Sequence, residues 1–182
     1  MTATQISLSA KNYADALVKL GKDGVLSFDD IYKNLEIVNE ITSLSPDLVN
    51  VLENPTISVD TKNSIVEEVF SNQIDSHIKD FLKILIEKNR FNELKGIIEA
   101  YSVELDNINN IKRVEVTSAI DLKEETKQRI IEKLQTKLQK TVIAQWLKNE
   151  EIIGGLVIKI DDDVIDSSLK NKLENLSKNL SI

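Results

Sequence analysis

The amino-acid sequence predicts an α+β protein, with an N-terminal six-helix bundle followed by a small C-terminal α/β domain of order β-α-β-β-α. The first observation is that apolar residues recur with helical spacing through residues 9–105. The second is a change to strand-like alternation after residue 111. The third is the presence of only 5 Gly and 2 Pro in 182 residues, which leaves long segments free to form helices.

Six amphipathic helices are expected in the first part, because each apolar group lies between capping or helix-breaking residues. Ser9 and Ser27 are suitable N-caps for the first two helices, Ser45 precedes a proline at the start of the third, and Asp75 or Ser76 can cap the fifth. The six predicted apolar faces are Tyr13, Ala16, Leu17 and Leu20; Ile31, Leu35 and Val38; Leu48, Val49 and Leu52; Ile65, Val66, Val69 and Phe70; Ile78, Phe81, Leu82 and Leu85; and Phe91, Leu94, Ile98, Tyr101 and Leu105.

The polar stretch DNINNI, at 106–111, is the expected boundary between two domains, 1–107 and 108–182. Beyond it, Val114 and Val116 alternate with polar residues, and the segments 141–147 and 155–160 are rich in strand-forming residues. Asp121 is the expected cap of a helix between the first two strands. A last helix, capped by Asp166 or Ser167, has an apolar stripe at Leu169, Leu173, Leu176 and Leu180, with the spacing i, i+4, i+7, i+11.

The composition disfavours several classes of protein. A net charge of −7 opposes tracking along nucleic acid or direct docking on anionic lipid. With no Cys and a single His, a zinc site of thiolates and imidazoles is nearly excluded and a disulfide is impossible. The N-terminus lacks the pattern of a signal or transit peptide, and no apolar run is long enough to span a bilayer. We therefore expect a soluble, intracellular chain.

The segment IIGGLVIKIDDDVIDSS, at 152–168, combines two glycines with four aspartates and raises the question of a phosphate or metal site. A phosphate-binding loop requires a lysine and a hydroxyl residue at fixed positions after the glycines, and these are missing. A calcium loop spaces its carboxylates at alternate positions, whereas Asp161, Asp162 and Asp163 are consecutive. The favoured interpretation is a solvated turn between two extended segments, with Gly154 and Gly155 at a bulge or a close backbone approach.

No catalytic constellation is evident elsewhere in the sequence. His77 is expected at the surface or at a helix cap, since no orienting carboxylate and nucleophile can be assigned to it. Trp146 lies in a strand pattern, where core or interface packing is the expected role. Many amphipathic helices without a cofactor motif favour an interaction module, in which a groove takes the amphipathic helix of a partner.

Five segments, in order along essentially the whole chain, resemble the delta subunit of F-type ATP synthase, called oligomycin-sensitivity-conferring protein in mitochondria. The segment NYADALVKL resembles a Tyr-Ala-x-Ala-Leu signature, and LENPTISVDTK resembles a Leu-x-Asn-Pro segment followed by lysine. The helix FLKILIEKNRFNELKGIIEAY, the strand exit VEVTSAIDL and the closing GGLVIKIDDDVIDSSLKNKL are similar to later segments of that family. One departure is Asp161, at a turn position where the family usually has glycine.

The resemblance implies a stator, a non-catalytic subunit that joins the catalytic head to the peripheral stalk and resists rotor torque. The family takes the N-terminal helix of an alpha subunit in a groove between its first and fifth helices, which here implies Tyr13, Ala16, Leu17, Phe81, Ile84 and Lys88. Plain core packing is the alternative for these residues, above all for Tyr13 and Leu17. The C-terminal part is implied to meet the peripheral-stalk b subunits, with Val164, Ile165, Leu169 and Leu173 as candidates.

The expected chain has no cofactor or metal of its own and binds no nucleic acid. It is a monomer in isolation and present as one copy per complex. It lies on the cytoplasmic face of an energy-transducing membrane, bacterial inner or plastid thylakoid, and associates with that membrane only through the complex. Two rivals remain from the residues alone: a generic helical adaptor, and a divalent-metal-dependent hydrolase built on Asp161–Asp163.

Overall fold

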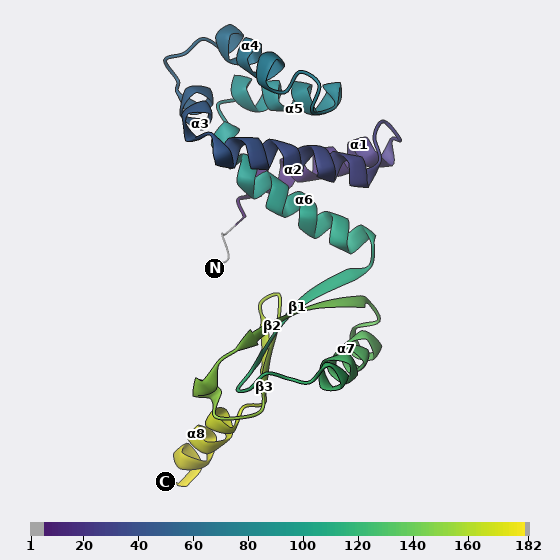
Figure 1. The fold of residues 1–182 in the computed structure, drawn as a ribbon, viewed down its shortest axis with the longest axis vertical. Helices are drawn as coiled ribbons and strands as arrows, with labels where there is room; N and C mark the ends of the chain where they lie inside the picture. Colours follow the sequence, from purple (N-terminus) through teal and green to yellow (C-terminus); the bar gives the residue numbers. More distant parts are fainter. Residues whose placement is uncertain (1–5, 181–182) are drawn as a thin grey trace. The chain divides into compact units, whose positions relative to one another are not determined.

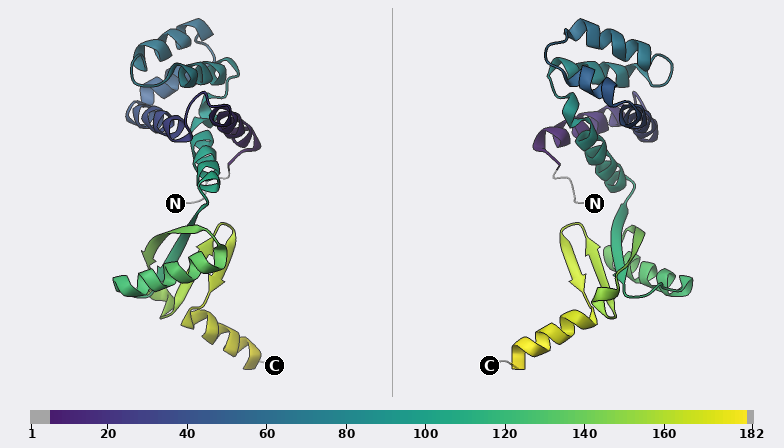
Figure 2. Two further views of the ribbon diagram at one scale, coloured as in Figure 1. Left: turned by 90° about the vertical axis from the view of Figure 1, so that its right-hand side faces the viewer. Right: turned by 60° about the vertical axis from the view of Figure 1, so that its left-hand side comes forward.

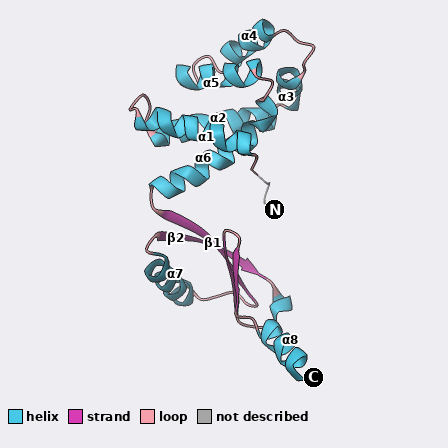
Figure 3. Cartoon of the chain, turned by 180° about the vertical axis from the view of Figure 1, so that it is seen from behind, coloured by secondary structure: helices cyan, strands magenta, loops and turns pink. Residues whose placement is uncertain are grey.

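The computed structural model describes residues 6–180, with side chains described as far as residue 176. It confirms an α+β protein: the described residues form eight α-helices and one small four-stranded sheet (Figures 1 and 3). The chain divides into two compact units, Met1–Leu105 and Asp106–Ile182, so the division falls inside the last turns of a helix that ends at Ile108. The expected boundary at 107/108 is two residues away.

The described part of the first unit contains six α-helices and one 3-10 turn, coloured purple to teal in Figure 1. The elements are α1 (Leu8–Lys22), α2 (Phe28–Leu44), α3 (Pro46–Glu53), α4 (Val59–Val69), α5 (Ser76–Glu87), η1 (Phe91–Glu93) and α6 (Leu94–Ile108). Each α-helix contributes buried apolar side chains to a single core, which explains why the helical periodicity in the sequence was so regular.

Capping residues set where these helices begin. The Ser27 hydroxyl accepts a bond of 3.0 Å from the Asp30 amide, as expected, and Asp75 accepts from the His77 amide at 2.8 Å. The predicted cap at Ser9 is wrong, because α1 begins two residues earlier. Ser7 accepts from the Ala10 amide at 3.0 Å and also donates to Glu93.

The centre of the first core is Tyr101 of α6, whose ring is fully buried and whose hydroxyl donates a 3.0 Å bond to the carbonyl of Phe28. Burial, aided by the negative charge of Asp29, raises the pKa of Tyr101 to about 12. Outside this core, Glu67 of α4 bonds to Lys79 and Lys83 of α5, and these two ammonium groups lower the pKa of that carboxyl to about 2. The α4–α5 pair is therefore joined by charge as well as by apolar contact.

The second unit is a sheet with strand order β2-β1-β3-β4 and a helix, α7 (Glu124–Leu138), on one face (Figure 2). The strands are β1 (Ile111–Ser118), β2 (Thr141–Lys148), β3 (Leu156–Ile160) and β4 (Asp163–Asp166). Strand β1 pairs in parallel with β2, as a βαβ crossover through α7 requires, and it pairs antiparallel with β3. A 3-10 turn, η2 (Glu150–Ile152), and a last helix, α8 (Leu169–Leu180), complete the unit.

The structure differs from the sequence-based expectations in the strand order and in the start of α7. The predicted order β-α-β-β-α lacks β4, a four-residue edge strand too short to show a clear alternation. The cap of α7 is also not Asp121, because the helix starts at Glu124 after Lys123, which makes no side-chain cap bond.

The aspartate run forms the tight turn of the β3–β4 hairpin. Ile160 pairs with Asp163, so Asp161 and Asp162 are the two turn residues. Asp161 has φ +52°, the left-handed region that glycine adopts most easily and aspartate tolerates, and its carboxylate pairs with Lys112 of β1. An aspartate thus makes the turn at the position where the resembled family usually has glycine.

Gly155 marks the place where the chain leading to α8 crosses the start of β3. Its φ is +86°, and a Cβ there would lie 2.5 Å from the carbonyl oxygen of Ser167. Beside it, the Leu169 amide donates to the Gly154 carbonyl at 2.9 Å. The expected close backbone approach is confirmed, but the cap of α8 is neither Asp166 nor Ser167: Ser168 accepts from the Asn171 amide at 3.1 Å.

The core of the second unit is small. Among the side chains that the structure describes, those buried in the cluster between the sheet and α7 are Val114, Val116, Leu134 and Val142, with a ring of partly buried apolar residues around them. Trp146 of β2 belongs to that ring, and the Lys127 ammonium lies 5.8 Å from the centre of its indole.

Candidate partner-binding surfaces

The six residues implied for the groove between α1 and α5 separate into buried and accessible sets. Leu17 and Phe81 are buried in the core, and Tyr13 is half-buried with its ring edge-on to Phe81, at a centroid distance of 6.1 Å. Ala16, Ile84 and Lys88 are exposed, with 46% of Ile84 open to solvent. The Tyr13–Phe81 contact brings α1 and α5 together, and we call Tyr13, Ala16, Ile84 and Lys88 the α1–α5 surface.

The α1–α5 surface can contribute apolar contact but shows no chemistry of its own. Ile84 lies on the outer side of α5, whose opposite side buries Ile78, Leu82 and Leu85. A single exposed aliphatic side chain is common on protein surfaces, so Ile84 does not by itself mark an interface. The small Ala16 lets a second helix approach the backbone of α1 closely.

His77 lies at the start of α5, where its Nδ1 is 2.8 Å from an oxygen of Asp75. The same carboxylate accepts from the His77 backbone amide, and these two bonds hold the pKa of Asp75 below its usual value. Asp75 therefore serves as the cap of α5 and binds the ring of the residue it caps. Of the two expected roles of His77, the structure gives the surface position, because the cap of α5 is Asp75.

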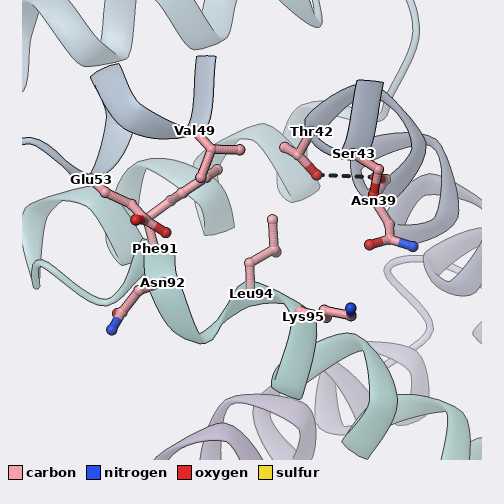
Figure 4. Close-up of a pocket in the computed structure, with 9 residues that line it drawn as sticks. All are labelled: Asn39, Thr42, Ser43, Val49, Glu53, Phe91, Asn92, Leu94 and Lys95. Atoms are coloured by element: carbon pink, nitrogen blue, oxygen red, sulfur yellow. Dashed lines mark hydrogen bonds between the residues drawn. The ribbon is translucent and has the colours of Figure 1, made fainter. Parts of the chain in front are cut away.

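A separate hollow of about 180 Å³ lies between α2, α3 and α6 (Figure 4). Its floor is Phe91 and Leu94, both buried, and its rim carries Asn39, Glu53 and Lys95. Thr42 on the same rim donates to the carbonyls of its own helix. None of the residues predicted for a partner surface lines this hollow.

The four candidates of the second unit are all exposed. Val164 and Ile165 lie on the edge strand β4 and point to opposite faces of the sheet, since neighbours in a strand alternate. Leu169 and Leu173 lie on α8, with exposed fractions of 47% and 56%. Leu176, at 57%, continues their line one turn later. The sequence pattern contained Leu176, but the candidate set did not.

Charge is unequally divided between the two units, which the total of −7 concealed. Residues 1–105 contain ten Lys and Arg against 17 Asp and Glu, whereas residues 106–182 contain 13 of each. The whole net negative charge therefore lies on the helical unit. A count by segment would have revealed this from the sequence.

The aspartates of the β3–β4 turn are not gathered as a metal centre. Within residues 6–180 no three His, Asp or Glu side chains are placed to hold one ion together. Nor does any described helix combine the length and the apolar character required to cross a membrane. The fold and its surfaces thus define a two-unit protein with an exposed apolar surface on each unit.

Comparison with known proteins identifies the family. The family described as ATP synthase delta (OSCP) subunit matches residues 10–180. Curated relatives named ATP synthase subunit delta include those of Clostridioides difficile, 34% identical with 97% of each chain covered, and Lachnoclostridium phytofermentans, 35% identical with 95% of each covered. The relative from Chlorobaculum tepidum is 32% identical with 96% of each chain covered.

The fold is shared with a chain in the cryo-EM structure of the Toxoplasma gondii mitochondrial ATP synthase hexamer. That chain has a TM-score of 0.67 and 17% sequence identity, over 97% of this chain and 98% of the other. This chain belongs to the ATP synthase delta (OSCP) subunit family, whose members are non-catalytic subunits of the ATP synthase. The resemblance noted in the sequence is confirmed, and the unrelated adaptor and the metal-dependent hydrolase are set aside.

Proposed function

We propose that this chain is the stator subunit that links the catalytic head of the F-type ATP synthase to the peripheral-stalk b subunits and resists rotor torque. The observation that carries this proposal is the pairing of family membership with one exposed apolar surface on each unit. When one chain is attached to a complex at two places, release of one attachment leaves the other in place, and the high effective concentration favours rebinding. The bound state of the chain therefore lasts longer without any additional contact. A stator requires slow dissociation rather than turnover.

In this proposal the first unit takes the N-terminal helix of an alpha subunit on the α1–α5 surface. Ile84 and Ala16 are the central contacts, Tyr13 lies beside them, and Lys88 lies at the end of α5. Leu17 and Phe81 support that surface from within the core. An amphipathic helix would cover Ile84, in the helix-in-groove mode of recognition.

The second unit attaches to the b subunits through Val164, Ile165, Leu169 and Leu173. The chain is a monomer in isolation and joins a membrane-associated complex as one copy, on the cytoplasmic face of a bacterial inner or plastid thylakoid membrane. Its connection to that membrane runs through its partner subunits.

The test is calorimetric titration of the full chain with a peptide from the N-terminus of the alpha subunit of the same organism. We expect tight binding that is lost in Ala16→Asp and in Ile84→Asp, each verified as folded by circular dichroism. Val25→Asp is the matched control, because Val25 belongs to the same unit and is 45% exposed, against 46% for Ile84. No binding by the folded wild-type chain would overturn the assignment of this partner. Binding that survives both substitutions would show that the alpha-subunit peptide binds elsewhere than on the α1–α5 surface.

A further inference from the structure

The exposed leucines of α8 are spaced as the seam of a coiled coil. Leu169, Leu173 and Leu176 follow the 4–3 spacing of alternating d and a positions, and the sequence extends it to Leu180. These three side chains are each about half exposed, so the unit itself does not cover the seam. The seam is one residue wide per turn, narrower than the stripe of a helix that packs on a protein core.

Lysines flank this seam in a protein that is otherwise acidic. With Leu169 at d and Leu173 at a, Lys170 falls at e and Lys172 at g, the positions whose charges select a partner in a coiled coil. Both lysines are exposed, and no ion pair within the part of the chain described involves either of them. Helix α8 carries three lysines and one glutamate, so its local charge is opposite to that of the chain.

We propose that α8 forms a short coiled coil with an amphipathic helix that has an aliphatic a/d seam and acidic residues at the flanking e and g positions. The proposal rests on the attachment of the second unit to the peripheral stalk, and it names the chemistry of that attachment. The partner helix covers Leu169, Leu173 and Leu176, and its carboxylates pair with Lys170 and Lys172. Opposite charges at these positions fix register and partner choice more than they add affinity.

Other occupants fit the same surface less well. A second copy of α8 would bring one lysine-flanked seam against another, so that like charges would meet at the e and g positions. A membrane surface favours a broad apolar face with aromatic residues, whereas residues 169–180 contain no Phe, Tyr or Trp. The narrow seam with charged flanks favours a protein helix.

The experiment titrates the full chain with a peptide of the C-terminal helix of the b subunit from the same organism, at low and at high salt. Leu173→Ser should weaken binding about tenfold or more, through loss of buried apolar contact. Its control is Ile143→Ser, because Ile143 is an exposed aliphatic residue of the same unit on β2, at the opposite edge of the sheet from the β3–β4 hairpin that leads into α8. The double variant Lys170→Glu/Lys172→Glu should weaken binding about three- to tenfold at low salt and less at high salt.

The control for the charge variant is Lys133→Glu/Lys137→Glu, which makes the same charge change on exposed positions of α7. Equal loss in both charge variants, or no loss in either, would overturn the acidic-flank assignment. Unchanged binding by Leu173→Ser would overturn the seam while leaving the stalk attachment intact elsewhere. No binding by the wild-type chain would instead overturn the stalk attachment itself. Sedimentation with phosphatidylglycerol vesicles, abolished by Leu173→Ser, would assign the seam to lipid and overturn the proposal.

Discussion

The two units of this chain bury apolar side chains to very different extents. Of the residues that the structure describes, 22 are buried in the core of the helical unit, whereas four are buried in the cluster between the sheet and α7. The second unit also leaves Val164, Leu169, Leu173 and Leu176 in solvent. It carries no net charge, whereas the first unit carries −7. The first unit has the core of a self-sufficient domain, while the second depends more on what covers it.

The largest expected effect breaks the first core. Leu82 of α5 is fully buried, so Leu82→Ala should lower the free energy of unfolding of the helical unit by about 3 kcal/mol through lost contact and a residual cavity. Urea denaturation followed by circular dichroism measures this change. If the two units unfold independently, the urea midpoint of the second unit stays unchanged. A shift of both midpoints would show that the units unfold together.

The next effect concerns the junction that leads into α8. Gly155→Ala should destabilise the second unit by about 2 kcal/mol, because the residue has positive φ and its Cβ would meet the Ser167 carbonyl oxygen. The control is Gly24→Ala, which has φ +74° but no atom within 4 Å of the added methyl group. That control should cost about 1 kcal/mol. Equal costs, measured by urea denaturation, would show that the close approach to Ser167 is not tight in solution.

A buried hydroxyl gives a smaller effect that depends on pH. Tyr101→Phe removes the bond to the Phe28 carbonyl and should cost about 1 kcal/mol near neutral pH. The pKa of Tyr101 is raised in the folded state to about 12, so its contribution is complete below the ordinary value of 10 and is lost as pH rises toward 12. Denaturation at pH 7 and at pH 11 should show the penalty of Tyr101→Phe shrinking. Tyr13→Phe, at a half-buried ring, is the control, and an unchanged penalty would contradict the raised pKa.

The smallest effect compares two caps of the helical unit. Ser27→Ala should cost about 1 kcal/mol, because the Ser27 hydroxyl caps the Asp30 amide. Ser45→Ala should change stability by less than about 0.5 kcal/mol, because Ser45 stands at the cap position of α3 without a side-chain bond. The measurement is the thermal midpoint of each variant. Equal shifts for Ser27→Ala and Ser45→Ala would show that a serine at the cap position matters, whether or not its hydroxyl makes a cap bond.

Much of the helical unit could be predicted from the sequence, because each helix buries one regular stripe and ends at a recognisable breaker. The starting residues were harder: Ser7 and Ser9 are both good caps, and only the bond to the Ala10 amide shows which is used. Strand β4 was missed since four residues beside an aspartate run carry no readable period.

The candidate surfaces show a different limit. Periodicity marks Leu17, Phe81 and Ile84 alike as apolar positions, and only tertiary packing decides that the first two are core and the third is exposed. On α8 the apolar stripe could be predicted from the leucine spacing, but nothing in the sequence shows that the rest of the unit leaves this stripe exposed. The net charge of each unit, by contrast, follows from counting the charged residues on each side of the boundary.

The aromatic residues are also divided between the units, with an optical consequence. The single Trp, Trp146, lies in the sheet beside Lys127, while the three Tyr, at 13, 32 and 101, all belong to the helical unit. Indole fluorescence, excited at wavelengths where Tyr does not absorb, therefore reports the second unit alone. An unlabelled sample thus lets events in the second unit be followed without a contribution from the tyrosines of the first.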